Sequence, residues 1–402
     1  MHIVFYISRF GIGGIQTFVI QLGKELIQLP EVKVSIFCHH PEQVDTSSNE
    51  PIPPEIEILT LSKNRRSIIV INKLRNWIKK VVPTFDLKEW LTTRYFLKIV
   101  QKNKIDLIHN NIQTGDENVY QAQQKIGIPY ITTLHGAYKE ITASMPLEMK
   151  EKYQVVFNKL LGTASSIVYL SPENLKPFEL VLGDLTAARK KQFVRIFNGI
   201  NAPNVVGEKG FKDEDLIVFG LIARGVHYKG WEEAILATKE LVSAYPERKI
   251  LLKLYGKSDY LNELEIKYQA YKDFVLFCGP TDTPLEVVQS FTIGLLPTYL
   301  PQEEMPFTII EYLACCKPVI ATDKGAIVEM LTIEGQIAGE IIKFDEAGKA
   351  DINALKKAME QFLLDPVYKE KKVLLAQKAF EKFDVKNTAK QYYNVYQKAL
   401  KK

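Results

Sequence analysis

The feature that most constrains the fold is an alternation of short apolar runs with longer stretches of helical periodicity. In the first half of the chain the apolar runs cover residues 3–7, 32–38, 105–108, 130–134 and 167–170. Short strands separated by helices are typical of a parallel sheet, because parallel strands need long crossover connections. The pattern therefore predicts the α/β class, with helices on both faces of the sheet.

The same alternation starts again in the second half of the chain. Apolar runs recur at residues 216–222, 250–255, 275–277, 293–296 and 319–321. Between the two series lies N-G-I-N-A-P-N at residues 198–204, which is rich in turn-forming residues. A length of 402 residues suits more than one hydrophobic core. We expect an N-terminal domain over 1–200 and a second domain over 201–385.

Composition narrows the class of protein. Apolar residues make up 46% of the chain, which excludes a mostly disordered protein, and the net charge of +5 is too small to imply nucleic acid as the main partner. The four cysteines form no C-x-x-C pair, as expected of a reduced cytosolic protein. The first apolar run is too short for a signal-peptide core, and no run approaches the length of about 18 residues that spans a bilayer.

The positive charge is concentrated in residues 63–104. This segment holds twelve Lys or Arg against Asp86 and Glu89, so its local net charge is +10 and the rest of the chain is slightly acidic. Apolar residues recur there at helical spacing up to Pro83, at Val70, Ile71, Leu74, Trp77, Ile78, Val81 and Val82. A basic amphipathic helix that carries a Trp is typical of a membrane-surface anchor. The alternative is a helix packed on the core whose polar face is basic.

A glycine loop follows the first apolar run. Gly11 and Gly13 fit the start of the dinucleotide fingerprint G-x-G-x-x-G, but Gln16 occupies its last position and His39 and His40 stand where an acidic residue is expected. These two departures from the fingerprint argue against an NAD-binding site. The loop could place backbone N–H groups near a phosphate, or it could be a tight turn without a ligand.

Two carboxylates follow the run at 293–296. Glu303 lies on the loop after it, Pro306 suits the first position of the next helix, and Glu311 falls more than one turn inside that helix. A half-buried carboxylate needs a partner, and a sugar diol offers two O–H donors. The alternative is an ordinary helix Glu that faces solvent.

Two cations follow the run at 216–222. Arg224 and Lys229 lie on a glycine-containing loop at the predicted carboxyl end of the strand, where they could clamp a diphosphate. Taken alone, the pair could equally be part of a surface loop.

Together these motifs resemble glycosyltransferase family 4, retaining sugar-nucleotide transferases of the GT-B fold. Glu303 and Glu311 match the E-x7-E motif of that family, and G-L-I-A-R-G-V-H-Y-K-G-W at 220–231 resembles its pyrophosphate loop. V-L-F-C-G at 275–279, N-G-I at 198–200, H-G at 135–136 and G-G-I-Q at 13–16 follow in the expected places. The resemblance implies two Rossmann-like, doubly wound domains that face each other across a cleft. It also implies that a C-terminal helix at 386–402 crosses back to the N-terminal domain; a terminal helix on the second domain is the alternative.

The resemblance also implies roles for individual residues. Glu303 touches the transferred sugar, Glu311 binds the ribose hydroxyls, and Arg224 and Lys229 stabilise the diphosphate leaving group together with helix N-terminal amides. His135 stands near sugar and phosphate. The implied catalytic residues are Glu303, His135, Arg224 and Lys229. The remaining donor-binding residues are Gly13, Gly14, Asn198, Phe277, Cys278, Gly279, Met305, Pro306, Phe307, Thr308 and Glu311.

The implied function is the transfer of a hexose or N-acetylhexosamine from a nucleotide sugar to a glycan or lipid-linked acceptor, in surface polysaccharide or glycolipid assembly of the bacterial type. We expect no metal, because D-E-D at 213–215 precedes the first strand of the second domain and reads as a solvated turn. UDP is favoured over GDP. Glu304 and Gln16 depart from the family pattern and leave the sugar open.

Other functions remain open. They are a GT-B epimerase or phosphorylase and a non-catalytic sugar-nucleotide-binding protein. A two-carboxylate glycosidase is disfavoured, because its mechanism has no role for Arg224 and Lys229. We expect a cytoplasmic protein held at the inner face of the cytoplasmic membrane by residues 63–104.

Overall fold

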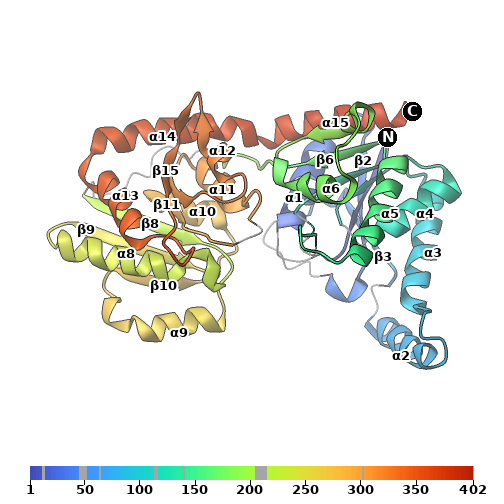
Figure 1. The fold of residues 1–402 in the computed structure, drawn as a ribbon, viewed down its shortest axis with the longest axis horizontal. Coiled ribbons are helices and arrows are strands. Elements are labelled where there is room, and N and C mark those ends of the chain that lie inside the picture. Colours follow the sequence, from blue (N-terminus) through green and yellow to red (C-terminus); the bar gives the residue numbers. More distant parts are fainter. Residues whose placement is uncertain are drawn as a thin grey trace. The chain divides into compact units, whose positions relative to one another are not determined.

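A computed structural model describes residues 1–10, 14–44, 52–62, 65–112, 116–136, 138, 141–203, 215–300 and 303–401. The chain divides into two compact units (Figure 1). One comprises Met1–Phe197 with Val385–Lys402, and the other comprises Asn198–Asp384. Each unit has its own sheet and its own core, so each is described separately.

The first unit is built on a seven-stranded sheet in the order β3-β2-β1-β4-β5-β6-β7. All neighbouring strands are parallel. The strands are β1 His2–Ile7, β2 Lys33–Cys38, β3 Glu57–Thr60, β4 Leu107–Asn110, β5 Tyr130–Leu134, β6 Ser166–Tyr169 and β7 Phe193–Arg195. Every residue of β1 is buried, as expected of a central strand covered on both faces.

Helices cover both faces of this sheet (Figure 1). The helices of the unit are α1 Gly14–Leu26, α2 Arg65–Val81, α3 Leu87–Lys102, α4 Asp116–Ile126, α5 Leu147–Thr163, α6 Lys176–Leu182, α7 Ala187–Lys190 and α15 Val385–Leu400. Asp86 starts α3 by accepting hydrogen bonds from the backbone N–H groups of Lys88 and Glu89, which supplies partners for two otherwise unpaired donors of the first turn. Helices α2 and α3 form a hairpin at one end of the unit (Figure 1).

The last helix, α15, packs on the first unit, as the resemblance implied. It contacts α1, and its buried tyrosines reach polar groups of β4 and β5. Tyr396 Oη lies 2.8 Å from His109 Nδ1, and Tyr392 Oη lies 3.0 Å from Thr133 Oγ1. His109 Nε2 also lies 2.7 Å from Thr133 Oγ1. The helix is therefore joined to the sheet by buried hydrogen bonds as well as by apolar contact.

The second unit contains a six-stranded sheet in the order β10-β9-β8-β11-β12-β15, again with all neighbouring strands parallel. Its strands are β8 Leu216–Ile222, β9 Lys249–Tyr255, β10 Val275–Gly279, β11 Ile293–Leu296, β12 Val319–Thr322 and β15 Gly339–Ile342. A small antiparallel pair, β13 Thr332–Ile333 and β14 Gln336–Ile337, stands apart from it. The helices are α8 Trp231–Ala244, α9 Asp259–Lys267, α10 Pro284–Gln289, α11 Phe307–Ala314, α12 Ile327–Leu331, α13 Ile352–Leu364 and α14 Pro366–Phe380.

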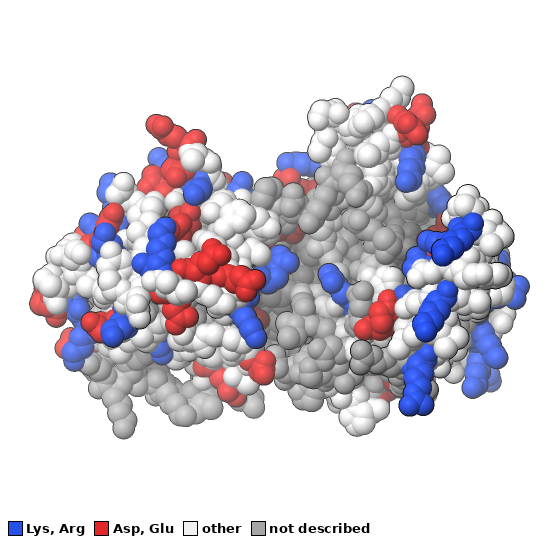
Figure 2. Space-filling model, turned by 90° about the horizontal axis from the view of Figure 1, so that it is seen from below, with Lys and Arg blue, Asp and Glu red and all other residues white. Residues whose placement is uncertain are grey.

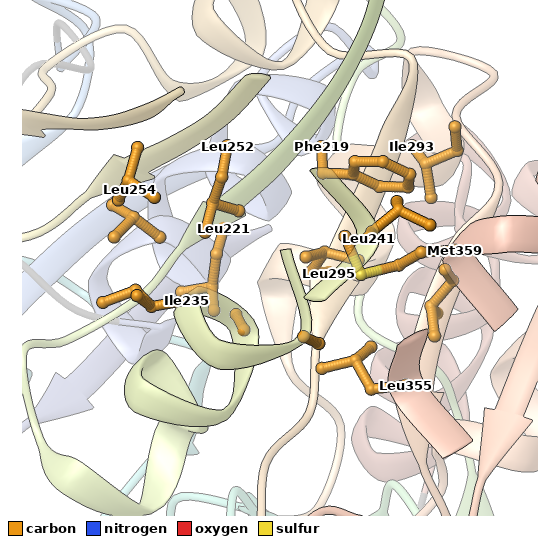
Figure 3. Close-up of a cluster of buried hydrophobic side chains, with 14 of the residues drawn as sticks. Phe219, Leu221, Ile235, Leu241, Leu252, Leu254, Ile293, Leu295, Leu355 and Met359 are labelled. Atoms are coloured by element: carbon orange, nitrogen blue, oxygen red, sulfur yellow. The ribbon is translucent and has the colours of Figure 1, made fainter. Parts of the chain in front are cut away.

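The core of the second unit lies between its sheet and two helices (Figure 3). Phe219, Leu221, Leu252, Leu254, Ile293 and Leu295 point from the sheet towards Ile235 and Leu241 of α8 and towards Leu355 and Met359 of α13. All ten side chains are buried. Burying one such side chain stabilises a fold by about 1.5–3 kcal/mol. These ten side chains therefore hold β8, β9 and β11 against α8 and α13.

The structure differs from the sequence analysis in detail. β3, β7 and β15 were not predicted, because each is short and lies outside the strongly apolar runs. β4 begins and ends two residues later than expected. Pro306 is the N-cap of α11 and not its first residue, since its ψ of 124° is still extended. Across the part of the chain that is described, no helix is both long and apolar enough to cross a membrane.

The hydrogen bond between Tyr396 and His109 provides a test of how α15 is held. Tyr396→Phe leaves a buried ring nitrogen without its partner, so we expect the free energy of unfolding to fall by about 1–3 kcal/mol in a denaturant titration. Tyr393→Phe, on the same helix but only partly buried, should change it by less than about 0.5 kcal/mol. Equal effects of the two substitutions would contradict the role of the hydrogen bond.

Candidate functional site

In the second unit the candidate residues lie where the central strands end. β8, β11 and β12 are neighbours and run in the same direction, so the loops that follow them meet at one edge of the sheet. The loop after β8 carries Arg224 and Lys229, and the loop after β11 carries Glu303. Hydrogen bonds join these loops: Tyr299 N donates to Tyr228 O at 2.9 Å, and Tyr299 Oη donates to His227 O at 3.1 Å.

A buried ion pair connects the two loops at their centre. Lys229 Nζ donates to Glu303 Oε2, and both side chains are only 9% exposed. Thr298 Oγ1 donates to the same carboxylate oxygen at 3.1 Å. Removing two charges from water is costly, and such a pair is stable only when hydrogen bonds satisfy its remaining polar groups. The structure thus brings together two of the predicted site residues, one cation and one carboxylate.

Two glycines permit this close approach of the loops. Gly230 has a φ of 78°, and a Cβ at this position would lie 2.2 Å from Pro297 O. Gly325 has a φ of 54°, and its Cβ would lie 1.8 Å from Glu303 O. Any side chain at either position would push backbone away, because these distances are far below normal contact and left-handed backbone favours glycine.

Helix α11 supplies the other predicted carboxylate. Its first turn is attached to β8 through Thr308 Oγ1, which donates to Ile222 O at 3.2 Å. Glu311 lies one turn further on and is partly buried; among the described residues no side chain pairs with its carboxylate. Burial raises the pKa of Glu311 to about 7. A buried carboxylate with a raised pKa and no side-chain partner among the described residues suits a ligand that donates hydrogen bonds.

The remaining predicted donor-binding residues of this unit are less closely grouped. Arg224 is exposed, and its carbonyl accepts a hydrogen bond from Trp231 Nε1 at 3.3 Å. Phe277, Cys278 and Gly279 end β10, which is the edge strand and is separated from β8 by β9. Met305 and Pro306 are buried, Phe307 and Thr308 are partly buried, and Asn198 is buried at the first position of the unit.

In the first unit His135 follows β5 directly. Its Nε2 lies 2.9 Å from Asn111 Oδ1, and the Phe18 ring meets the imidazole edge-on at 4.9 Å between centroids. Burial lowers the pKa of His135 to about 3, so the ring is neutral at physiological pH. Gly14 is the exposed first residue of α1. Gly13 lies outside the described residues.

Sequence reasoning missed several residues that shape the site. Thr298, Gly325 and Tyr312 were not singled out, yet Thr298 donates to Glu303 and Gly325 allows the loop to pass. The Tyr312 hydroxyl lies 3.2 Å from Gly220 O and 3.1 Å from Leu295 O. The sequence pointed to these residues only through their position. Thr298 lies just after the predicted strand at 293–296, and Gly325 lies after the predicted strand at 319–321. Their contacts join segments far apart in the sequence.

The described part of the chain contains no group of three His, Cys, Asp or Glu side chains that could hold a metal ion. Of the D-E-D motif, Asp215 is exposed at the amino end of β8, and its two other residues lie outside the described ranges.

Two family models match the chain, one on each half. The model described as Glycosyltransferase Family 4 matches residues 12–201, and the model described as Glycosyl transferases group 1 matches residues 214–365. None of the curated proteins compared with the chain matches it.

Several solved structures share the fold over almost the whole length. A glycosyltransferase from Rickettsia africae has a TM-score of 0.71 at 18% identity, covering 100% of this chain and 98% of that one. Anabaena HepE, in complex with UDP and glucose, has a TM-score of 0.67 at 18% identity, covering 98% of each chain. A mutant of S. aureus TarM, in complex with Fondaparinux, alpha-GlcNAc-glycerol and UDP, has a TM-score of 0.69 at 11% identity, covering 98% and 99%.

The two models divide where the two parallel-sheet units divide, and together they span most of the chain. The shared fold of the solved transferases agrees with this assignment. The chain is a glycosyltransferase of the GT-B fold, with a first half that matches Glycosyltransferase Family 4 and a second half that matches Glycosyl transferases group 1.

Proposed function

We propose that this enzyme transfers a hexose or N-acetylhexosamine from a nucleoside-diphosphate sugar to a hydroxyl of a glycan or lipid-linked acceptor, with retention of configuration. The observation that carries the proposal is the pair formed by Lys229 and Glu303 beside the first turn of α11. A cation and helix N-terminal amides suit a diphosphate, and the adjacent carboxylate suits the hydroxyls of the attached sugar.

The ion pair of Lys229 and Glu303 suggests how the sugar nucleotide binds. The diphosphate competes for Lys229 Nζ, and the sugar hydroxyls compete for the Glu303 carboxylate, so one internal ion pair is exchanged for two contacts with substrate. As the bond to the sugar breaks, negative charge grows on the diphosphate. Lys229, the exposed Arg224 and the backbone N–H groups of Phe307 and Thr308 stabilise it in this scheme.

We propose UDP as the base-bearing part of the donor and no requirement for a metal. HepE and TarM support UDP, since both bind it. Two cationic side chains on one loop support metal independence, because they supply the positive charge that a diphosphate needs. On this scheme Glu311 binds the ribose diol, His135 contacts the sugar, and Phe277 to Gly279 lie beside the base.

The direct test is a panel of UDP- and GDP-sugars with glycan and lipid-linked acceptors. We expect UDP to be released from one UDP-sugar only when acceptor is present, with the configuration at the sugar retained in the product and the rate unchanged by excess chelator. UDP release or sugar isomerisation without acceptor would indicate an epimerase. Consumption of donor with phosphate as the acceptor would indicate a phosphorylase, and loss of activity in chelator would remove metal independence.

Glu303→Gln tests the role of the carboxylate. It removes the charge but keeps the size, so we expect turnover to fall by about 100-fold or more. UDP should bind at least as tightly as before, because its diphosphate no longer competes with a carboxylate for Lys229. Glu263→Gln, an exposed substitution on α9, is the matched control and should change neither value. Full turnover in Glu303→Gln would leave only a nucleotide-sugar-binding role for the pair.

Glu311 provides a test by pH. Because burial raises the pKa of Glu311 from 4.5 to about 7, the folded state holds a proton that the unfolded state has lost, and stability falls as the pH rises between these two values. A ribose diol that donates to the ionised carboxylate would lower this pKa, so UDP binding at pH 7 should release protons, as calorimetry in buffers of different ionisation enthalpy measures.

Glu311→Gln should abolish this proton release and weaken UDP binding about tenfold to hundredfold, since hydrogen bonds to a charged group are worth about 1.5–3 kcal/mol. Proton release that persists in Glu311→Gln would show that another group responds to the nucleotide.

We further propose that the enzyme works on the surface of an anionic membrane, through the outer face of α2. Its apolar positions separate in the structure: Ile68 is buried and Ile71 and Ile78 are partly buried on the inner side. The outer side presents Val70, Leu74, Trp77 and Val81 at exposures of 62, 47, 64 and 68%. These four positions recur at helical spacing, so they form one exposed apolar stripe. A basic helix packed on the core would hide such a stripe.

Charge supports an anionic surface as the partner of this stripe. Arg66, Lys73 and Lys80 are exposed and recur every seven residues, so they run along the helix beside the apolar stripe. Figure 2 shows Lys and Arg gathered on the part of the molecule where α2 and α3 lie. On the inner side Asp86 binds Arg75 Nη2 at 2.6 Å and Lys79 Nζ at 3.0 Å, which fixes the hairpin and leaves the outer face to the lipid.

Liposome co-sedimentation tests this surface. We expect binding to vesicles containing anionic lipid, no binding to neutral vesicles, and release at high salt. Trp77→Ala and the triple substitution Arg66→Glu, Lys73→Glu, Lys80→Glu should each weaken binding about tenfold or more. The triple substitution Lys272→Glu, Lys357→Glu, Lys371→Glu changes the net charge equally at exposed positions of the second unit and is the control. Equal loss in both triples would make the effect one of net charge alone.

A further inference from the structure

A buried amide stands behind the histidine of the first unit. Asn111 directly follows β4, and His135 directly follows β5, its neighbour in the sheet. Asn111 is 1% exposed, and its backbone N–H donates to Tyr6 O at 2.9 Å. Its place is therefore set by the sheet, whereas the His135 imidazole is partly exposed at the edge of the sheet.

The contacts of Asn111 decide which way its amide faces. The side-chain nitrogen Nδ2 donates to His109 O at 2.9 Å, and a carbonyl oxygen can only accept. The other amide atom, Oδ1, therefore faces His135 Nε2 at 2.9 Å. Since an amide oxygen can also only accept, His135 Nε2 must carry a hydrogen.

A neutral imidazole has one protonated nitrogen, so this arrangement leaves His135 Nδ1 with a lone pair. Burial lowers the pKa of His135 to about 3, which keeps the ring neutral. The Phe18 ring, itself buried, meets the imidazole at 65° and limits its rotation. Among the described residues no group bonds to Nδ1.

We infer that Asn111 is a positioning residue that holds His135 as a neutral hydrogen-bond acceptor for a hydroxyl of the sugar substrate. The inference rests on the proposed function for the identity of that substrate. A lone pair at Nδ1 binds an O–H donor and repels the oxygens of a diphosphate, which are themselves acceptors. His135 then contributes to the choice of sugar and supplies no positive charge to the leaving group.

The tautomer can be read directly by long-range ¹H–¹⁵N NMR correlation on the full chain, with the His135 signals identified by their loss in His135→Gln. We expect wild type to show the Nε2–H tautomer from pH 5 to 8 without titration. Asn111→Ala should give a mixture of tautomers, and Asn118→Ala, another buried amide of this unit that does not touch His135, should not. A protonated Nδ1 in wild type, or a ring that titrates near neutrality, overturns the inference.

Asn111→Asp keeps the test decisive if Asn111→Ala does not fold. A carboxylate still accepts from Nε2–H, although its second oxygen loses the hydrogen bond that Nδ2 donates to His109 O. It also adds a negative charge, so the tautomer should persist while the pKa of His135 rises. The pH profile of transfer should then acquire a new acidic limb. A purely structural role for Asn111 would lower activity at every pH equally, and that result contradicts the inference.

Deoxy-sugar donors test the hydroxyl. We expect one deoxy position whose removal lowers kcat/KM about tenfold or more in wild type but adds no loss in Asn111→Ala, because the acceptor is already misplaced. Additive losses at every position overturn the hydroxyl assignment. Failure of the proposed function is distinguishable, because the NMR measurement needs no turnover: a chain that transfers no sugar would remove the function while the tautomer could still be read.

Discussion

The seven-stranded and the six-stranded sheet are both entirely parallel, and the arrangement of the site depends on this constraint. Parallel strands bring all their carboxyl ends to one edge, so the loops after β8, β11 and β12 must share a small space. The loops fit because Gly230 and Gly325 have no Cβ where backbone carbonyls approach most closely. The register of the strands thus sets the distance between Lys229 and Glu303 before any substrate arrives.

The buried pair has a second consequence for the enzyme. A charge buried without a partner is strongly destabilising, so in the absence of substrate Lys229 and Glu303 must satisfy each other, with Thr298 completing the carboxylate. In the proposed scheme the diphosphate of the donor takes the place of Glu303 beside Lys229, and the sugar hydroxyls take the place of Lys229 beside Glu303. Glu311 differs, because it has no protein partner among the described residues and responds by holding a proton more tightly.

The first unit uses its polar groups in two different ways. Inside, His109, Thr133, Tyr392 and Tyr396 form a satisfied network that joins α15 to the sheet and leaves nothing for a ligand. At the edge, Asn111 uses both of its amide atoms, and the other nitrogen of His135 has no bonded group among the described residues. The apolar side chains of α2 also lie in two environments: Ile68 is buried against the unit, whereas Trp77 is exposed.

The sequence by itself determined the α/β class, most strands, the basic segment and the E-x7-E spacing of Glu303 and Glu311. These features are local, because they follow from periodicity and from the order of residues. The sequence also indicated Arg224 and Lys229 by their place on the loop after a predicted strand, and His135 through resemblance. Only the tertiary structure decided that Lys229 pairs with Glu303, that Asn111 fixes His135, and that Ile71 turns inward while Trp77 does not. These contacts join residues 24 to 74 positions apart or depend on which helix face meets the unit. No local pattern encodes them, since they arise from strand order and packing.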